Sequence, residues 1–427
     1  MKSKVYYGEY SLMHWVNMML SQEITLPDYQ RSFVWKEKDI KRLLKSFSEN
    51  QFVQPVTIAL YPGTSEIGRQ NLILDGQQRL TTILLAYLGF IPDLSQFAKD
   101  DTLATGDDSA EDGSTKAVKW TFKLLFDSDN SNNCVEKIRN RLLGDPKYLP
   151  LSVEGLEYEG ERESAIVNYL KNKFLGFSYI VPDTQNESDI HNGYTRLFRN
   201  INYFGKKLTP LASRRSLYYA DRDYKNYFEG LADLVPAESI LGGILIKEKM
   251  DYNTIDFVRY LSTLSQYAIA HDKTQILKGY SAYSSRESYF ADYVSYILHL
   301  DQEDREQKFN GFVFDAVFPD QCWKSRYAKL KEYVAQMRHQ WGLEPKEDKW
   351  AFTSWIDADY WLYGLIYQIV FEGKELNQDI NQLYIDIQSA ISIKKDPVTG
   401  YPKTPNMVTN LRERIEHSIN LYSGYVH

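Results

Sequence analysis

Apolar residues recur at helical spacing near the beginning of the chain. Ser11 is a good helix N-cap, and the apolar positions after it predict a short amphipathic helix that breaks at Ser21. A second stripe of the same kind predicts a helix over residues 40–47, with lysine and arginine side chains mostly outward, before Pro55. The apolar positions of the first helix are Leu12, Trp15, Val16, Met19 and Leu20.

A strand, a loop, a strand and a helix are predicted next. Residues 56–60 are β-prone and residues 71–74 are apolar, and the proline and glycines between them favour a loop. Residues 80–88 then place apolar side chains on one helical face, and Gly89 closes that helix.

The pattern changes along the rest of the chain. Residues 120–126 are typical of a strand, and residues 165–175 predict a helix that leads into an apolar segment at 179–181. From about Tyr252 onward the apolar spacing is almost entirely helical, so we expect an all-helical domain there.

The length and composition of the chain indicate more than one hydrophobic core. A chain of 427 residues is too long for one ordinary core, and 43% hydrophobic residues are enough to bury a large one. We therefore predict an α+β protein in which residues 1–230 form a mixed domain and residues 231–427 a mainly α-helical region.

No targeting or metal signal is evident. The first residues lack the basic and apolar parts of a secretory signal, and no stretch approaches the roughly 18 apolar residues of a membrane span. A cytoplasmic protein without a membrane partner is the expectation. Cys134 and Cys322 are far apart and stand in no metal-ligand spacing, so neither a disulfide framework nor a zinc site is expected, and no residue is assigned as a metal ligand.

Charge is segregated along the chain. The formal net charge of −7 argues against a protein coated in basic surface. Residues 93–119 are rich in aspartate, glycine, serine and threonine, which predicts a solvated, mobile insertion. Residues 196–225 are rich in arginine and lysine, so we expect DNA phosphates to bind there. The candidate DNA-binding side chains are Arg199, Lys206, Lys207, Arg214 and Arg215.

The segment Asp75-Gly76-Gln77-Gln78-Arg79 combines groups that bind phosphate. It joins a predicted strand to a predicted helix, which brings backbone N–H groups, the positive helix end and a guanidinium together. Gly76 allows close backbone approach, the glutamines offer amides, and Arg79 can hold phosphate bidentately. Asp75 can orient a magnesium-bound water or a ribose. The plainer alternative is a capping Asp75, a turn at Gly76 and a surface ion pair at Arg79.

A second segment favours the phosphate site. Residues 29–35, Tyr-Gln-Arg-Ser-Phe-Val-Trp, set a glutamine and an arginine beside aromatic residues, which is costly to bury unless the guanidinium has a fixed partner. This YQR-x-x-x-W segment and the DGQQRLTT segment at residues 75–82 resemble the N-terminal domain of the GmrSD family of modification-dependent restriction endonucleases. A third block also resembles that family, with Asn202, Gly205, Leu208 and Thr209 at matching positions. The resemblance covers roughly the first half of the chain.

The resemblance implies a fold similar to the ParB and sulfiredoxin nucleotide-binding domains, and for some members NTP hydrolysis. The implied cofactors are an NTP, whose identity the sequence leaves open, and Mg²⁺. Asp75 and Arg79 become the catalytic candidates, and Gln30 and Arg31 would close the site from the facing segment. The implied phosphate-binding residues are Gln30, Arg31, Gly76, Gln77, Gln78 and Arg79.

Restriction proteins of this family usually carry a second module with a His-Asn nuclease motif. None of the 7 histidines stands in such an arrangement, so nuclease activity is doubtful, and His417 is expected on the surface of a terminal helix. We expect Asp357 and Asp359 to be solvated helix charges. Core packing rather than base stacking is expected for the nearby tryptophans, which are Trp323, Trp341, Trp350, Trp355 and Trp361.

Three functions remain open on the sequence. The first is a nucleotide-binding, NTP-hydrolysing sensor or effector of a bacterial restriction or anti-phage system that acts on DNA with a partner nuclease subunit. The second is a self-contained modification-dependent DNA endonuclease. The third is a non-catalytic interaction subunit of a defence complex, although an intact Gln-Gln-Arg segment makes that less attractive.

Overall fold

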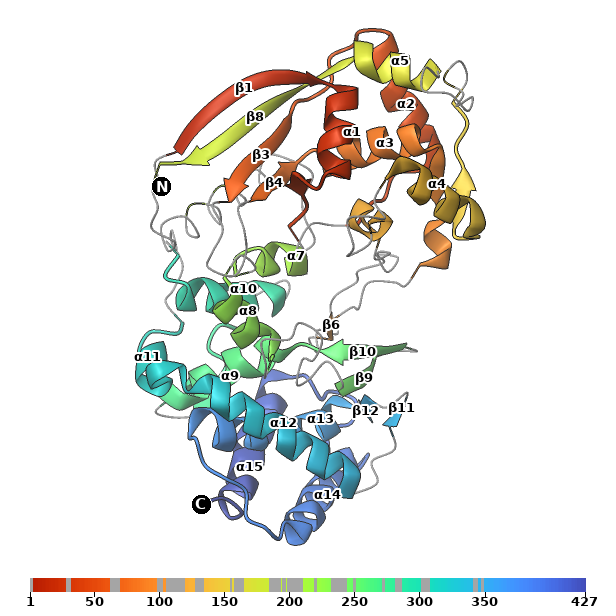
Figure 1. Ribbon diagram of the computed structural model, residues 1–427. Coiled ribbons are helices and arrows are strands. Elements are labelled where there is room, and N and C mark those ends of the chain that lie inside the picture. The colour runs from red at the N-terminus through yellow and green to blue at the C-terminus, as the bar shows by residue number, and fades with distance from the viewer. Residues whose placement is uncertain are drawn as a thin grey trace. The chain divides into compact units, whose positions relative to one another are not determined.

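The computed structural model resolves the chain into two compact units, which are described separately (Figure 1). The first unit comprises Met1–Asp100 and Ser114–Ala212, and the second comprises Asp101–Gly113 and Ser213–His427. The division falls before the boundary at residue 230 that the sequence suggested. The structure describes residues 3–27, 32–61, 70–97, 103–104, 120–126, 134–153, 156, 165–183, 193, 197, 210–218, 221–231, 244–248, 251–270, 273–280, 286–300, 308–340, 345–346 and 349–427.

A five-stranded mixed sheet, ordered β1-β8-β3-β4-β2, forms one side of the first unit. The outer pair β1 and β8 is antiparallel over nine residues, β8 and β3 are parallel, β3 and β4 are antiparallel, and β4 and β2 are parallel. The strands are β1 (Ser3–Ser11), β2 (Ile24–Thr25), β3 (Val56–Tyr61), β4 (Gln70–Asp75) and β8 (Phe174–Pro182).

Helices gather beside this sheet, as Figure 1 shows for α1, α2, α3 and α5. Helix α3 is central because it packs against α1, α2 and α5, and eleven of its twelve residues are buried. The helices are α1 (Leu12–Leu20), α2 (Glu37–Ser48), α3 (Gln77–Leu88), α4 (Val135–Gly144) and α5 (Ala165–Asn172). Smaller elements are the strand pair β5 (Phe90–Pro92) and β7 (Tyr148–Pro150), and the 3₁₀ turns η1 (Leu94–Gln96) and η2 (Phe122–Leu125).

The second unit also contains a five-stranded sheet, ordered β11-β12-β9-β10-β6. Strand β6 comes from the aspartate-rich insertion and pairs in parallel with β10. An all-helical second domain was therefore wrong, although helices still dominate it. The strands are β6 (Leu103–Ala104), β9 (Ile244–Glu248), β10 (Asp251–Ile255), β11 (Pro345–Lys346) and β12 (Lys349–Phe352).

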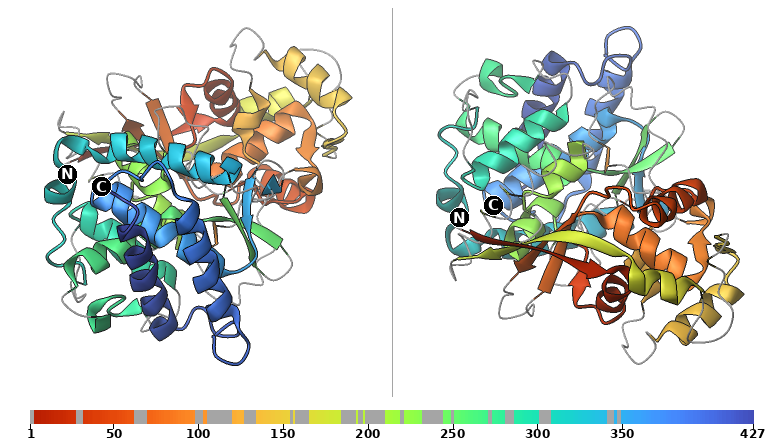
Figure 2. Two further views of the ribbon diagram at one scale, coloured as in Figure 1. Left: turned by 90° about the horizontal axis from the view of Figure 1, so that it is seen from below. Right: turned by 90° about the horizontal axis from the view of Figure 1, so that it is seen from above.

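The core of the second unit is built by helices, and the blue helices α13, α14 and α15 lie side by side in Figure 2 and contact one another. Gly364 in α13 permits this approach, since an added Cβ would collide with Tyr422 and the Ser418 carbonyl of α15. The helices are α7 (Pro210–Arg215), α8 (Arg222–Glu229), α9 (Phe257–Ile269), α10 (Arg286–Ile297), α11 (Phe314–Val317), α12 (Trp323–Gln340), α13 (Trp355–Ile366), α14 (Asn381–Lys395) and α15 (Val408–Ser423). Shorter turns are η4 (Lys273–Gln275), η6 (Pro319–Gln321) and the π-helical η7 (Tyr367–Phe371).

Most of the predicted elements of the first unit are confirmed. Ser11 caps α1 by accepting a hydrogen bond from the backbone N–H of His14, and Gly89 ends α3 in a left-handed conformation. The strand expected at residues 120–126 was wrong, because residues 122–125 form the 3₁₀ turn η2 and bury Phe122 and Leu125. Three residues per turn place this pair on one side.

Part of the aspartate-rich insertion lies outside the described residues, namely 98–102 and 105–119. Among the residues that the structure describes, no helix has the length and apolar character needed to cross a bilayer.

Candidate functional site

The junction between β4 and α3 is a tight left-handed turn. Strand β4 ends at Asp75, Gly76 adopts φ +96° and ψ 9°, and α3 begins at Gln77. An added Cβ at Gly76 would collide with Cγ1 of Val56 in β3. Both the positive φ and the close approach therefore require glycine at this position.

The N-cap of α3 is Gly76, which has no side chain to accept a hydrogen bond from the first turn of the helix. The first turn of a helix presents backbone N–H groups without intrahelical partners and carries the positive end of the helix dipole. Helix N-termini are places where proteins commonly bind anions.

Arg79 lies over the same turn. Its Nη2 donates to Asp75 Oδ2 at 2.9 Å and to the Pro55 carbonyl at 3.4 Å, and its Nη1 donates to Gln54 Oε1 at 3.3 Å. The side chain is 13% exposed, whereas that of Asp75 is 39% exposed. The structure thus brings the two catalytic candidates, Asp75 and Arg79, into one ion pair beside the α3 N-terminus.

Gln78 has a different use from the one expected. Its side chain is buried, its Oε1 accepts a hydrogen bond from the Val34 N–H at 3.0 Å, and its Nε2 donates to the Ser32 carbonyl at 3.0 Å. Both ends of the amide are therefore occupied by the backbone of the YQR-x-x-x-W segment. Gln78 joins the two motifs and positions one beside the other.

The remaining members of the predicted phosphate site divide into two groups. Gln77 lies in the first turn of α3 with its side chain buried. Gln30 and Arg31 lie outside the described residues, directly before Ser32. Gln54 and Pro55, which contact Arg79, were missed, because the sequence around them carries no motif.

The basic segment contributes less to a DNA surface than expected. Arg199, Lys206 and Lys207 lie outside the described residues, as do the matching positions of the third block, Asn202, Gly205, Leu208 and Thr209. Arg214 and Arg215 are described, and both are engaged inside the second unit.

Arg214 is fully buried and forms ion pairs with Asp256 of the α9 N-cap and Glu287 of α10. Arg215 binds Glu229 bidentately, with Nε to Oε1 at 2.9 Å and Nη2 to Oε2 at 2.8 Å. Burial raises the pKa of Glu229, but Arg215 outweighs it and holds the pKa below its usual value. Their placement on a DNA surface is corrected, because both guanidinium groups are committed to carboxylates of their own unit.

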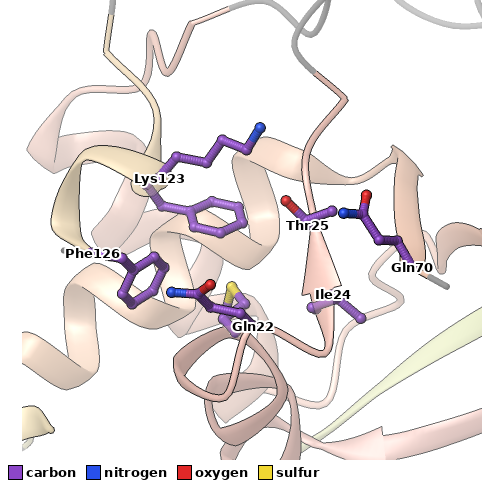
Figure 3. A pocket seen from close by; sticks show the side chains of 8 residues that line it. Gln22, Ile24, Thr25, Gln70, Lys123 and Phe126 are labelled. Atoms are coloured by element: carbon purple, nitrogen blue, oxygen red, sulfur yellow. The ribbon is translucent and has the colours of Figure 1, made fainter. Parts of the chain in front are cut away.

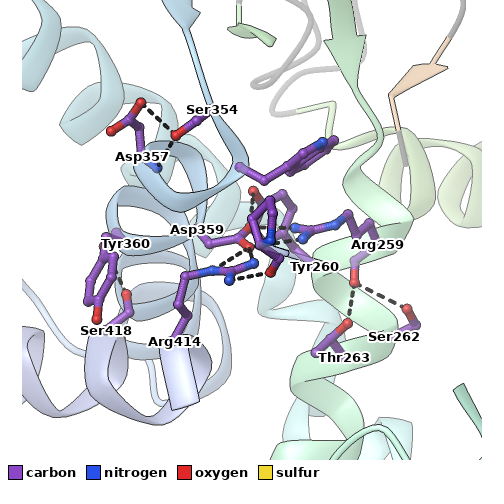
Figure 4. A network of polar contacts seen from close by, with 12 residues as sticks. Arg259, Tyr260, Ser262, Thr263, Ser354, Asp357, Asp359, Tyr360, Arg414 and Ser418 are labelled. Atoms are coloured by element: carbon purple, nitrogen blue, oxygen red, sulfur yellow. Dashed lines mark hydrogen bonds and ion pairs between the residues drawn. The ribbon is translucent and has the colours of Figure 1, made fainter. Parts of the chain in front are cut away.

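A second correction concerns the acidic residues of α13. Asp359 is fully buried between Arg259 and Arg414, as Figure 4 shows, and is not a solvated helix charge. Asp357, near the start of the helix, accepts hydrogen bonds from the hydroxyls of Thr353 and Ser354 and forms an ion pair with Lys395.

His417 lies on the terminal helix α15, as expected, where it is half-buried and its Nδ1 lies 2.9 Å from the Tyr360 hydroxyl. Burial lowers the pKa of His417. The core role expected for the tryptophans is confirmed for Trp323, Trp355 and Trp361. Trp341 lies outside the described residues.

Within the part of the chain that the structure describes, no group of three or more His, Cys, Asp or Glu side chains is arranged to hold a metal ion. The first unit contains an open cavity of about 280 Å³ that none of the residues of the Asp75–Arg79 turn lines (Figure 3).

Comparison with known proteins points to the same region of the chain. A family described as the GmrSD restriction endonuclease, N-terminal domain, matches residues 14–219, just under half of the chain. An uncharacterized protein of Methanocaldococcus jannaschii is 27% identical over 245 residues, which cover 47% of this chain and 40% of that relative. The chain thus spans less than half the length of that relative. No solved structure matches the chain.

Proposed function

Because residues 14–219 belong to the GmrSD restriction endonuclease N-terminal domain family, we propose that the chain is a nucleotide-binding sensor or effector of a restriction or anti-phage system that acts on DNA. The observation that carries the proposal is the uncapped N-terminus of α3 with the Arg79 guanidinium beside it.

In this proposal the phosphates of an NTP accept hydrogen bonds from the first-turn N–H groups of α3 and from Arg79. Asp75 pairs with Arg79 when the site holds no nucleotide, and its half-exposed carboxylate is placed to orient Mg²⁺ through water. Hydrolysis of the NTP then requires a water held near Asp75. A ParB/sulfiredoxin-like fold for the first unit is part of the same proposal.

Gln78 acts as a positioning residue in this scheme. By holding Ser32 and Val34, its amide fixes the end of the segment that contains Gln30 and Arg31. Those two side chains belong to the proposed site on the basis of the sequence.

The DNA contacts are proposed for Arg199, Lys206 and Lys207. They rest on the charge of the segment, since Arg214 and Arg215 are used internally. A partner nuclease subunit would supply cleavage in this scheme.

Calorimetric titration of ATP, GTP, CTP and UTP with Mg²⁺ tests the proposal. One or more nucleotides should bind wild type, and Arg79→Ala should weaken binding by at least about 100-fold because two charge-assisted hydrogen bonds are lost. Arg79→Lys should fall between them, since lysine keeps the charge but loses the bidentate fork. Phosphate release from each bound nucleotide then separates hydrolysis from binding alone.

Arg42→Ala is the matched control, because Arg42 is exposed on α2. Circular dichroism should show that all three variants fold. If folded wild type binds none of the four nucleotides, the proposal fails and the role of an interaction subunit takes its place.

A further inference from the structure

A cavity of the first unit lies away from the Asp75–Arg79 turn. It opens where the end of α1, strand β2 and the 3₁₀ turn η2 meet, and Gln70 at the first position of β4 lines it. The Asp75–Arg79 turn begins at the other end of β4. At about 3.3 Å per strand residue, Gln70 and Asp75 are roughly 16 Å apart.

The walls of the cavity combine aromatic rings with amide groups. Phe122 and Phe126 of the η2 region contribute rings whose centroids are 6.1 Å apart in an edge-to-face arrangement. Figure 3 shows the Gln22 amide facing the Phe126 ring, and the Gln70 amide directed toward the side chain of Thr25. The faces of aromatic rings and the donors and acceptors of two amide groups therefore line the same cavity.

The position of Gln22 follows from the end of α1. Ser21 is the C-cap of that helix, and Gln22 then adopts φ +59°, the left-handed conformation in which helices commonly end. Both Gln22 and Gln70 are exposed, so a ligand can reach their amides.

We infer that this cavity binds a single nucleobase. A carboxamide presents a donor and an acceptor side by side, which matches the edge of a base, and a phenylalanine ring stacks on its face. A volume of about 280 Å³ lies just below the usual range for small-molecule sites, which suits a ligand as small as one base.

A nucleobase can come from a free nucleotide or from single-stranded nucleic acid. Either is distinct from the NTP proposed at the α3 N-terminus, because the two places lie at opposite ends of β4. Binding of a base in this cavity therefore does not depend on NTP binding at the α3 N-terminus.

Fluorescence of 2-aminopurine tests the site in the full chain. The probes are 2-aminopurine riboside monophosphate and a short single-stranded DNA with one 2-aminopurine. Entry of the base into the cavity should change the probe's fluorescence saturably, and Gln70→Leu and Phe126→Ala should each weaken binding by about 10-fold. A saturable change with the monophosphate alone would identify a free nucleotide as the source, and much tighter binding of the oligonucleotide would identify nucleic acid.

Gln51→Leu is the matched control, because Gln51 is an exposed glutamine that does not line the cavity. Arg79→Ala should also bind the probes like wild type, which separates this site from the proposed NTP site. Gln70→Leu removes an exposed amide and so leaves the fold intact even if Phe126→Ala does not. The inference is overturned if the fluorescence of neither probe changes saturably, or if the folded Gln70→Leu variant binds both as tightly as wild type.

Discussion

Glu287 is a buried carboxylate whose pKa is raised. Its side chain is buried beside Arg214, which also pairs with Asp256. Burial raises its pKa to about 7, with Asp256 adding to the rise and Arg214 opposing it. Its usual value is 4.5, so between pH 4.5 and 7 the folded state binds more protons than the unfolded state. The free energy of unfolding contributed by this group therefore falls as the pH rises through that window.

Glu287→Gln should remove this pH dependence. Wild type should lose up to roughly 3 kcal/mol of unfolding free energy between pH 4.5 and 8 from this group, whereas glutamine has no proton to lose. Urea unfolding of both proteins at several pH values measures the difference. Glu332→Gln, at an exposed position of α12, is the control. Parallel pH profiles for wild type and Glu287→Gln would show that Glu287 does not titrate in this range.

At the residue scale, the sequence identified chemically unusual side chains but not their partners. Arg79 and Asp75 were expected together and lie 2.9 Å apart. Arg214 was expected to meet DNA, and its partners lie 42 and 73 residues along the chain. Local spacing cannot reveal a partner at such a separation, because only the folded core brings the two together.

At the element scale, one buried carboxylate ties three helices together. Asp359 of α13 accepts hydrogen bonds from Arg259 of α9, at 2.6 Å and 3.0 Å, and from Arg414 of α15, at 2.7 Å and 3.1 Å. Trp355 covers Arg259, with its ring centroid 4.2 Å from Cζ, which supports the positive charge through its π face. Burial raises the pKa of Asp359, but the two arginines outweigh it and hold the pKa below its usual value.

Asp359→Asn should therefore destabilise the second unit by about 3 to 5 kcal/mol, since both buried guanidinium groups lose their carboxylate. Urea unfolding at pH 7 measures the loss. Asp379→Asn is the control, because Asp379 is exposed and caps a backbone N–H, a role that asparagine also fills. Equal midpoints for Asp359→Asn and wild type would contradict a net stabilising role for the ion pairs.

The elements that the sequence missed share a physical reason. Strand β1 is exposed along most of its length, so it has no apolar face to produce an alternating pattern. The sheet of the second unit is built from strands of two to five residues, and two of its pairings, β6 with β10 and β9 with β12, join strands more than 100 positions apart. Long amphipathic helices such as α2 and α9 were predictable, because their own residues define the buried face.

At the scale of the whole molecule, the net charge opposes DNA binding, whereas a local basic segment favours it. A chain of formal charge −7 repels DNA on average, so any binding must come from a local basic segment. Arg214 and Arg215 are neutralised by carboxylates of the second unit. The proposed attraction is therefore left to Arg199, Lys206 and Lys207.

A double variant, Lys206→Ala with Lys207→Ala, tests this division of charge. Each phosphate contact releases counterions and contributes about 0.9 to the slope of log affinity against log salt concentration, so the slope should fall by about 2. Fluorescence anisotropy with duplex DNA over a salt series measures it. The control double variant, Lys41→Ala with Lys45→Ala, removes two exposed lysines of α2 that pair with Glu37 and Glu49. Because both variants change the net charge equally, only direct phosphate contacts distinguish them, and equal slopes would remove residues 206 and 207 from the DNA surface.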